Sequence, residues 1–411
     1  MKKLIVIFLF LSLLAAKTKP VKVGADVLLE SRFDLIKGKR IALVTNQSAI
    51  LSNGKHLADV LHKRHDVKLV ALFGPEHGIR SDASDGITVG DTVDLATGVP
   101  VYSLYGKINK PTPEMLNNID VLLFDVQDVG ARYYTYISTM FLCMEAAAEN
   151  NIHFVVLDRP NPISGENIEG PIRLDSLKSF VWWVPIPIIH GMTIGELAIL
   201  SNVSGWFKGK PKPKLTIVQL EQWKRSMWFD DTKLPWRKPS PNMISVLTAI
   251  VYPGTCLIEG TNVSEGRGTD KPFEYIGAPW IDGKQLAKEL NEQNLSGVKF
   301  EPIEFTPHDI PSVAFNPKYK EELCRGIFVH VTDRKKLESV KTGLTVIWAI
   351  NKLYPDSFSF KEKGFDRLMG TPVPREMISS GKNVDDIVSL WENEIDLFRK
   401  IRAKALLYLK H

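Results

Sequence analysis

Short apolar runs alternate with helical patterns between residues 38 and 160, and this alternation constrains the fold more than any other feature of the sequence. The runs that we predict to be buried strands are 40–45, 67–73, 99–104, 121–126 and 153–157. Helical patterns at 55–64 and 133–150 lie between them. Near-continuous apolar strands that alternate with helices are typical of a parallel sheet covered on both faces. With right-handed crossovers, the pattern predicts a Rossmann-like, doubly wound α/β domain.

Two further helix starts combine a hydroxyl residue with an acidic residue in the first turn. Thr112 is expected to cap a helix in which Pro113 takes the first position, followed by Glu114. A second helix is expected to start at Thr193, with Glu196 in its first turn. Both patterns predict a helix that begins at the capping residue.

The second half of the chain has a different organisation, which predicts a second domain. Residues 160–250 are irregular and rich in Pro and Trp, and we place a boundary near residue 251. We therefore expect a Rossmann-like catalytic domain over 21–250 and a smaller α+β domain over 251–411 that completes a cleft. The second domain is expected to open with an apolar strand around Cys256. Its other predicted elements are strands near 298–305 and 327–331 and helices near 283–291 and 337–353.

The N-terminus has the pattern of a secretory signal peptide at residues 1–16. Lys2 and Lys3 precede a 13-residue run, 4–16, that is apolar apart from one serine and ends in two alanines. A membrane-spanning helix needs about 20 apolar residues. We therefore expect export to the periplasm or medium and no stable membrane span after cleavage. An uncleaved anchor is the alternative, because Leu14 makes the cleavage site imperfect.

Composition excludes several classes of protein. The 411 residues carry a net charge of +5 without a block of like charges, so no nucleic-acid partner is expected. No G-x-G-x-x-G follows the first strand, and no H-E-x-x-H or G-x-S-x-G motif occurs, so we expect neither cofactor nor metal. The three cysteines, at positions 143, 256 and 324, are odd in number and the first two lie in apolar segments, so we predict buried structural thiols.

Polar residues follow four of the predicted strands, where a doubly wound sheet binds its ligands. If the predicted topology holds, these loops converge at one edge of the sheet. The candidates within them are Asn46, Glu76, His77, Arg80, Asp128, Arg132, Tyr134, Asp158, Arg159 and Asn161. Candidates from elsewhere in the chain are His190, at the end of a Pro-rich stretch, and Asn262, Glu265 and Arg267, in a polar loop.

Clustered carboxylates shift one another's pKa, which suits one of them to act as a general acid. Glycoside hydrolysis uses two carboxylates that flank the bond, and arginine forks hold anionic groups. Neighbouring tyrosines and tryptophans offer apolar faces to a sugar ring. The structural alternatives are that Asp158 and Arg159 take part in ion pairs, that Asp125 only caps a turn, and that His190 is a half-buried residue with no ligand.

Several unusual motifs resemble one known family. They are GPEHGIR, VYSLYGK, DVQDVGARYYTYISTM, LDRPNP, HGMTIGELA, PSPN, LIEGTNVSEGRGT and FDRLMGT. In this order and over about residues 24–405, the chain is similar to the bacterial NamZ family of exo-β-N-acetylmuramidases, formerly a domain of unknown function.

The resemblance implies a Rossmann-like domain, a smaller C-terminal domain and an active site in the cleft between them. It also implies an exported enzyme that removes N-acetylmuramic acid (MurNAc) from the non-reducing end of peptidoglycan fragments such as MurNAc-GlcNAc, in cell-wall turnover. Glu76 would be the leading catalytic carboxylate and general acid. The catalytic set predicted with it is His77, Asp128 and Glu265; Arg80, Arg132 and Arg267 also match the family's motifs.

Several points stay open at the level of sequence. Glu265, Asp128 and Glu259 compete as second carboxylate, and a route assisted by the substrate's N-acetyl group needs none. An arginine in the cleft could bind the lactyl carboxylate of MurNAc, but the sequence does not select one. A non-catalytic sugar-binding protein on the same scaffold is the alternative function. An amidase is disfavoured by the lack of zinc or serine motifs.

Overall fold

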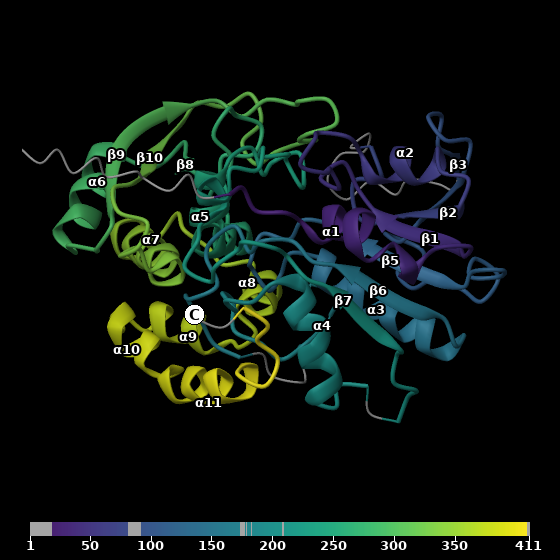
Figure 1. The fold of residues 1–411 in the computed structure, drawn as a ribbon. Coiled ribbons are helices and arrows are strands. Elements are labelled where there is room, and N and C mark those ends of the chain that lie inside the picture. Colours follow the sequence, from purple (N-terminus) through teal and green to yellow (C-terminus); the bar gives the residue numbers. More distant parts are fainter. Residues whose placement is uncertain are drawn as a thin grey trace, which may run out of the picture.

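The computed structural model describes residues 19–408 apart from 81–91, 173–176, 178, 182 and 208. The predicted signal peptide at 1–16 lies outside these residues. Figure 1 shows the N-terminal part of the chain, in purple and blue, as a sheet with helices on it. The green and yellow C-terminal part forms a second sheet and a group of helices beside the first. No helix in the described part of the chain is long and apolar enough to cross a membrane.

The larger sheet has seven strands in the order β3-β4-β2-β1-β5-β6-β7. Every pairing is parallel except that of β3 with β4. Their bounds are β1 Arg40–Thr45, β2 Lys68–Gly74, β3 Thr92–Val93, β4 Pro100–Ser103, β5 Val121–Asp125, β6 His153–Leu157 and β7 Leu215–Val218. The predicted doubly wound sheet is therefore confirmed, and the strand order reverses between β1 and β5, where this fold places its ligands.

Alternate strand residues feed two separate apolar cores, as the two-residue period of a strand requires. In β1, Ile41 and Leu43 face the core beneath the helices α1 and α2, whereas Ala42 and Val44 face the core beneath α3 and α4. The bounds of these helices are α1 Gly24–Ser31, α2 Leu57–His62, α3 Tyr136–Glu149 and α4 Ile194–Val203. Helices on both faces explain why the strands are apolar on both sides.

The second part of the chain is built on a three-stranded antiparallel sheet in the order β8-β10-β9. Its strands are β8 Tyr275–Ala278, β9 Val298–Phe305 and β10 Cys324–Val331. The helices are α5 Val246–Thr255, α6 Gly283–Glu292, α7 Ser339–Leu353, α8 Glu362–Met369, α9 Val373–Ser379, α10 Val384–Ser389 and α11 Glu392–Arg402. Short 3-10 turns are η1 Phe33–Leu35, η3 Phe229–Thr232 and η4 Cys256–Gly260. This arrangement confirms the smaller α+β domain.

Two predicted elements are wrong. The segment after Thr112 forms turns and no helix, although the Thr112 hydroxyl still accepts from the Met115 amide at 3.4 Å. The predicted strand around Cys256 is the end of α5 followed by η4. A short apolar run does not distinguish a buried strand from a buried helix, because both are apolar on every side. The predicted boundary near residue 251 falls within α5.

Candidate functional site

A cavity of about 90 Å³ lies where the carboxyl end of β2 and the start of α3 meet α5 and the loops on either side of α5. Segments far apart in sequence therefore build one site. Its lining residues are Glu76, His77, Tyr133, Tyr134, Thr135, Tyr136, Ser240, Asn242, Met243, Tyr252, Arg267 and Phe273. Of the predicted residues, the structure brings Glu76, His77, Tyr134 and Arg267 together here.

A tight turn after β2 brings Glu76 to the cavity. His77 and Gly78 both have left-handed backbone conformations, with φ of 73° and 74°. A Cβ atom on Gly74 would lie 3.2 Å from the Gly78 Cα, so the two sides of the turn are in contact. A non-glycine residue in this conformation costs on the order of 1 kcal/mol or more, and such strain is often found at functional sites.

Two hydroxyl residues face the Glu76 carboxylate. The Thr135 hydroxyl donates to Glu76 Oε2 at 2.9 Å, from the residue that precedes α3. Burial and the nearby Glu76 charge raise the pKa of the Tyr105 phenol, so Tyr105 remains a neutral hydrogen-bonding group. Glu76 is half-buried. It therefore combines a fixed orientation with access to the cavity, as a proton-transfer residue requires.

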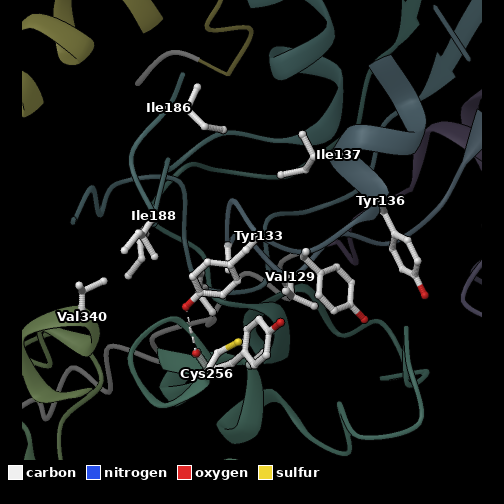
Figure 2. Packing of buried hydrophobic residues seen from close by; sticks show 14 of the residues in the cluster. Val129, Tyr133, Tyr136, Ile137, Ile186, Ile188, Cys256 and Val340 are labelled. Atoms are coloured by element: carbon white, nitrogen blue, oxygen red, sulfur yellow. Dashed lines mark hydrogen bonds between the residues drawn. The ribbon is translucent and has the colours of Figure 1, made fainter. Parts of the chain in front are cut away.

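Aromatic rings form one wall of the cavity. Tyr252 of α5 packs edge-on against Tyr134 and Phe273, with ring centroids 6.0 and 4.8 Å apart. The Arg267 guanidinium lies 5.0 Å from the centre of the Phe273 ring. Figure 2 shows Tyr133 directed toward the turn at Cys256, where its hydroxyl donates to the Pro253 carbonyl oxygen. The start of α3 is thereby fixed to the end of α5.

Carboxylates surround Arg267. Its Nη2 donates to Glu259 Oε1 at 2.9 Å, and its Nε lies 3.7 Å from Glu265 Oε1. Lys318 Nζ donates to Glu265 Oε2 at 2.9 Å and to the Val263 carbonyl oxygen at 2.8 Å. Glu265 is therefore buried behind Arg267. Of Glu259, Glu265, Arg267 and Lys318, it is Arg267 that is among the residues that line the cavity.

Opposing effects act on the pKa of Glu259. Burial and the Glu265 carboxylate raise this pKa to about 8, and the Glu76 charge adds to the rise. The ion pair with Arg267 favours the ionised form of Glu259 and opposes the rise. A carboxyl group whose pKa is raised, close to a second carboxylate, is the arrangement that glycoside hydrolysis uses.

Asp128 and His190 lie together behind the tyrosines of the cavity. Asp128 Oδ2 accepts from the Gly130 amide at 2.7 Å and lies 3.7 Å from His190 Nε2. His190 Nδ1 accepts from the Met192 amide at 3.2 Å, which leaves the proton on Nε2. Both side chains are buried. Burial raises the pKa of Tyr134, and the nearby Asp128 charge adds to this rise, so Asp128 acts on a residue that lines the cavity.

Two predicted binding residues, Asn46 and Arg80, lie outside the lining of the cavity that contains Glu76. Asn46 is buried, and its Nδ2 donates to the Pro239 carbonyl oxygen at 3.2 Å. Arg80 contacts Asp59 at 2.7 Å and Asp94 at 3.0 Å and lines a different, larger cavity. Neither side chain lines the cavity that contains Glu76.

Arg132 and Arg159 are used inside the protein. Arg132 is 2% exposed and donates to four carbonyl oxygens, those of residues 171, 186, 368 and 369. Arg159 forms a buried two-pronged ion pair with Asp125, at 2.6 and 3.1 Å. Arg159 thus takes part in an ion pair, as the structural alternative expected, but its partner is Asp125 and not Asp158.

Asp158 anchors the end of the chain to the sheet. Its carboxylate accepts from the Thr193 hydroxyl at 2.7 Å, the Gly195 amide at 2.8 Å and the Tyr408 hydroxyl at 2.6 Å. Burial raises the pKa of Asp158 to about 7. Thr193 also caps α4 in a reciprocal pair with Glu196, which confirms the helix start expected there.

The two remaining asparagines brace loops. Asn161 Nδ2 donates to the Met192 carbonyl oxygen at 2.9 Å. Asn262 Nδ2 donates to the Ser357 carbonyl oxygen at 2.8 Å, and its Oδ1 accepts from the Ser359 amide at 2.9 Å. The proposed binding roles of both asparagines stay predictions, and neither residue lines the cavity.

Several residues near the site were missed as site residues. Thr135 stands in the family motif DVQDVGARYYTYISTM, and Tyr252 stands in the apolar run before Cys256. A hydroxyl in such a run gives no chemical signal of its own. Lys318 stands in no motif and comes 53 residues after Glu265, so only the fold brings them together. Within the described residues no group of three or more His, Cys, Asp or Glu could hold a metal. The cysteines are buried and free, as predicted.

The chain matches two family models. Residues 41–247 match the model described as exo-β-N-acetylmuramidase NamZ, N-terminal, and residues 250–408 match the C-terminal counterpart. A curated relative from Bacillus subtilis (strain 168), named peptidoglycan β-N-acetylmuramidase NamZ, is 52% identical over 394 residues. The aligned region covers 96% of this chain and 92% of the relative.

Two crystal structures of DUF1343 family proteins from Bacteroides fragilis have a similar fold. One is 39% identical, with a TM-score of 0.87, and the match covers 95% of this chain and 99% of that one. The other is 33% identical, with a TM-score of 0.76, and covers 96% and 100%. Similarity over nearly the whole length includes every segment that lines the cavity.

Proposed function

The chain belongs to the NamZ family of exo-β-N-acetylmuramidases, and from this premise we propose that it releases MurNAc from the non-reducing end of MurNAc-GlcNAc fragments. It is a glycoside hydrolase of peptidoglycan, as its 52% identical relative is named. The single observation that supports the site is the position of Glu76, half-buried in the cavity and near Glu259, whose pKa burial raises.

In this proposal Glu76 delivers the proton to the glycosidic oxygen. The bond between the MurNAc anomeric carbon and that oxygen breaks, and GlcNAc leaves with a free hydroxyl. A water molecule adds its oxygen to the anomeric carbon and returns a proton to the carboxylates, so the site is restored. Thr135 fixes the Glu76 side chain, and Glu259, whose pKa is raised, is the nearby group that can hold the proton.

Arg267 is our candidate for the group that binds the lactyl carboxylate of MurNAc. Of the four arginines predicted from the sequence, it alone lines the described part of the cavity. The other three lie in the interior or in the wall of the larger cavity, with acceptors at 3.1 Å or closer. A guanidinium that can exchange a protein carboxylate for a substrate carboxylate would distinguish MurNAc from GlcNAc.

Release of free MurNAc from MurNAc-GlcNAc is the direct test, with a GlcNAc-terminated disaccharide as the control substrate. Glu76→Gln should lower kcat by about 10²–10⁴-fold, because the amide cannot supply the proton, and should leave the fold intact. Retention of most activity by that variant would remove Glu76 from the acid role. Saturable binding of MurNAc without product by the wild type would indicate a sugar-binding protein.

We also propose that the protein is exported. The support is the sequence of residues 1–16, with two lysines before an apolar run of 13. Fractionation of cells that express the full chain, followed by N-terminal sequencing of the product, tests the proposal. A cytoplasmic product that retains Met1 would contradict it.

A further inference from the structure

A second cavity, of about 880 Å³, lies beside the one that contains Glu76. Its volume is within the range of about 300–1,000 Å³ that is typical of small-molecule sites. The second cavity is lined by Gln47, Ile50, Gly54, Lys55, His56, Asp59, Val60, Lys63, Arg80, Trp236, Arg237, Lys238 and Pro241.

One segment separates the two cavities. Trp236 to Lys238 and Pro241 line the second cavity, whereas Ser240, Asn242 and Met243 line the first. The Pro239 carbonyl oxygen between them accepts from Asn46 Nδ2, from Gln47 Nε2 at 2.9 Å and from the Tyr136 hydroxyl. The wall is therefore fixed from both sides, and the second cavity keeps a defined position relative to Glu76.

The second cavity is strongly cationic. Lys55, Lys63, Arg237 and Lys238 are exposed, and none of them pairs with a carboxylate within the described part of the chain. Among the described residues one acidic side chain lines it, that of Asp59, which Arg80 contacts at 2.7 Å. Four cations with no described carboxylate partner around one concavity attract and hold an anion in a way that scattered surface charges do not.

An apolar face accompanies these charges. Trp236 is half-buried, its indole nitrogen donates to the Met243 carbonyl oxygen at 3.2 Å, and its ring packs edge-on against Phe229 at 4.8 Å. Ile50 and Val60 add aliphatic surface. A fixed aromatic ring next to cations fits a sugar that carries a carboxylate, because the ring faces the sugar and the cations bind the anion.

We propose that the second cavity binds the lactyl carboxylate of the next MurNAc along the same glycan strand, beyond the GlcNAc of the bond that is cleaved. This inference rests on the proposed function, since MurNAc and GlcNAc alternate in that substrate. Every strand longer than a disaccharide whose internal MurNAc carries no stem peptide presents such a carboxylate two sugars beyond the terminal MurNAc. The subsite therefore favours longer fragments over the disaccharide.

The kinetic test compares MurNAc-GlcNAc with the tetrasaccharide MurNAc-GlcNAc-MurNAc-GlcNAc. In the double variant Lys63→Gln/Arg237→Gln, KM for the tetrasaccharide should rise about fivefold, which is the effect expected for exposed ion pairs. Its kcat and both constants for the disaccharide should stay unchanged. Lys288→Gln, on α6 and with 76% of its side chain exposed, is the matched control and should change neither substrate.

A binding measurement separates the subsite from the reaction. Calorimetric titration of the Glu76→Gln protein should give a Kd for the tetrasaccharide about fivefold lower than for the same tetrasaccharide with its internal carboxylate amidated. Equal affinities, or an equal effect of the double variant on both substrates, would overturn the subsite. Absence of MurNAc release by the wild type would overturn the proposed function alone, because this titration does not depend on turnover.

Discussion

At the scale of single residues, the raised pKa of Glu259 sets the expected pH dependence. Burial and the Glu265 charge raise this pKa to about 8, so Glu259 keeps its proton below that pH and loses it above. We expect kcat/KM to fall as the pH rises through about 8. In Glu259→Gln the alkaline limb should move, since the coupled carboxylate that holds the proton is gone.

A pH profile of MurNAc release from pH 4 to 10, for the wild type and for Glu259→Gln, measures this shift. Glu289→Gln is the control, because Glu289 lies on α6 and pairs with Lys352 at 2.8 Å, outside the residues that line the cavity. An alkaline limb at the same pH in all three proteins would show that Glu259 does not contribute to it.

The sequence predicts that a carboxylate faces the cavity only where the residues around it specify an unusual backbone turn. The position of Glu76 at the cavity could be predicted because a strand ends just before it and glycines flank it, whereas its catalytic role stays a prediction from the family resemblance. Arg132 and Asp158 follow strands in the same way, yet they turn inward to carbonyl oxygens and hydroxyls. Whether a side chain that follows a strand points into the cavity or into the interior of the protein cannot be predicted from the sequence.

At the scale of elements, the close crossing of α5 and α7 governs the shape of the site. A Cβ on Gly254 would lie 1.8 Å from the Ser339 carbonyl oxygen, and one on Gly343 would lie 2.1 Å from the Gly254 carbonyl oxygen. Gly343→Ala should therefore lower the free energy of unfolding by about 1–3 kcal/mol, because the helices must move apart. Activity should fall as well, since α5 carries Tyr252 into the cavity.

Gly364→Ala, in α8, is the matched control for this crossing. The nearest atom to its new Cβ would lie 3.8 Å away, so nothing has to move. The gain in helix propensity should raise the free energy of unfolding by about 0.5–1 kcal/mol. Urea denaturation of both variants measures the contrast. Equal stabilities would show that the helices separate without cost.

Most elements could be predicted from their pattern, and those that could not have physical reasons. The strands at 40–45 and 153–157 agree with β1 and β6 residue for residue, because both are continuous apolar runs between polar residues. The edge strand β7 was missed, since its short LTIV run lies within the Pro- and Trp-rich segment that we predict to be irregular. The short strand β8 was missed within a loop-like sequence.

At the scale of the whole molecule, one apolar core joins the two halves of the chain. The core that contains Val44 and Phe124 of the larger sheet continues to Ile276 of β8 and Phe398 of α11. Arg132 adds polar contacts from the first half to the carbonyl oxygens of residues 368 and 369. We therefore expect unfolding in one cooperative transition, although the chain has more than one domain.

Arg132→Gln removes the polar contacts between the halves. Loss of charged hydrogen bonds to buried carbonyl oxygens should lower the free energy of unfolding by about 2–3 kcal/mol. The single transition itself is tested in the wild type, for which calorimetry and tryptophan fluorescence should report one shared midpoint. Two separate midpoints in the wild type would show that the halves are independent despite their common core.

Tyr408 lies at the end of the described chain, and its hydroxyl donates to Asp158 and accepts from the Leu220 amide at 2.9 Å. A residue 188 positions beyond Leu220 therefore holds the segments that follow β6 and β7 together. A truncation that removes Tyr408 should leave the buried Asp158 carboxylate without one of its donors, so a change far along the chain should loosen the first sheet.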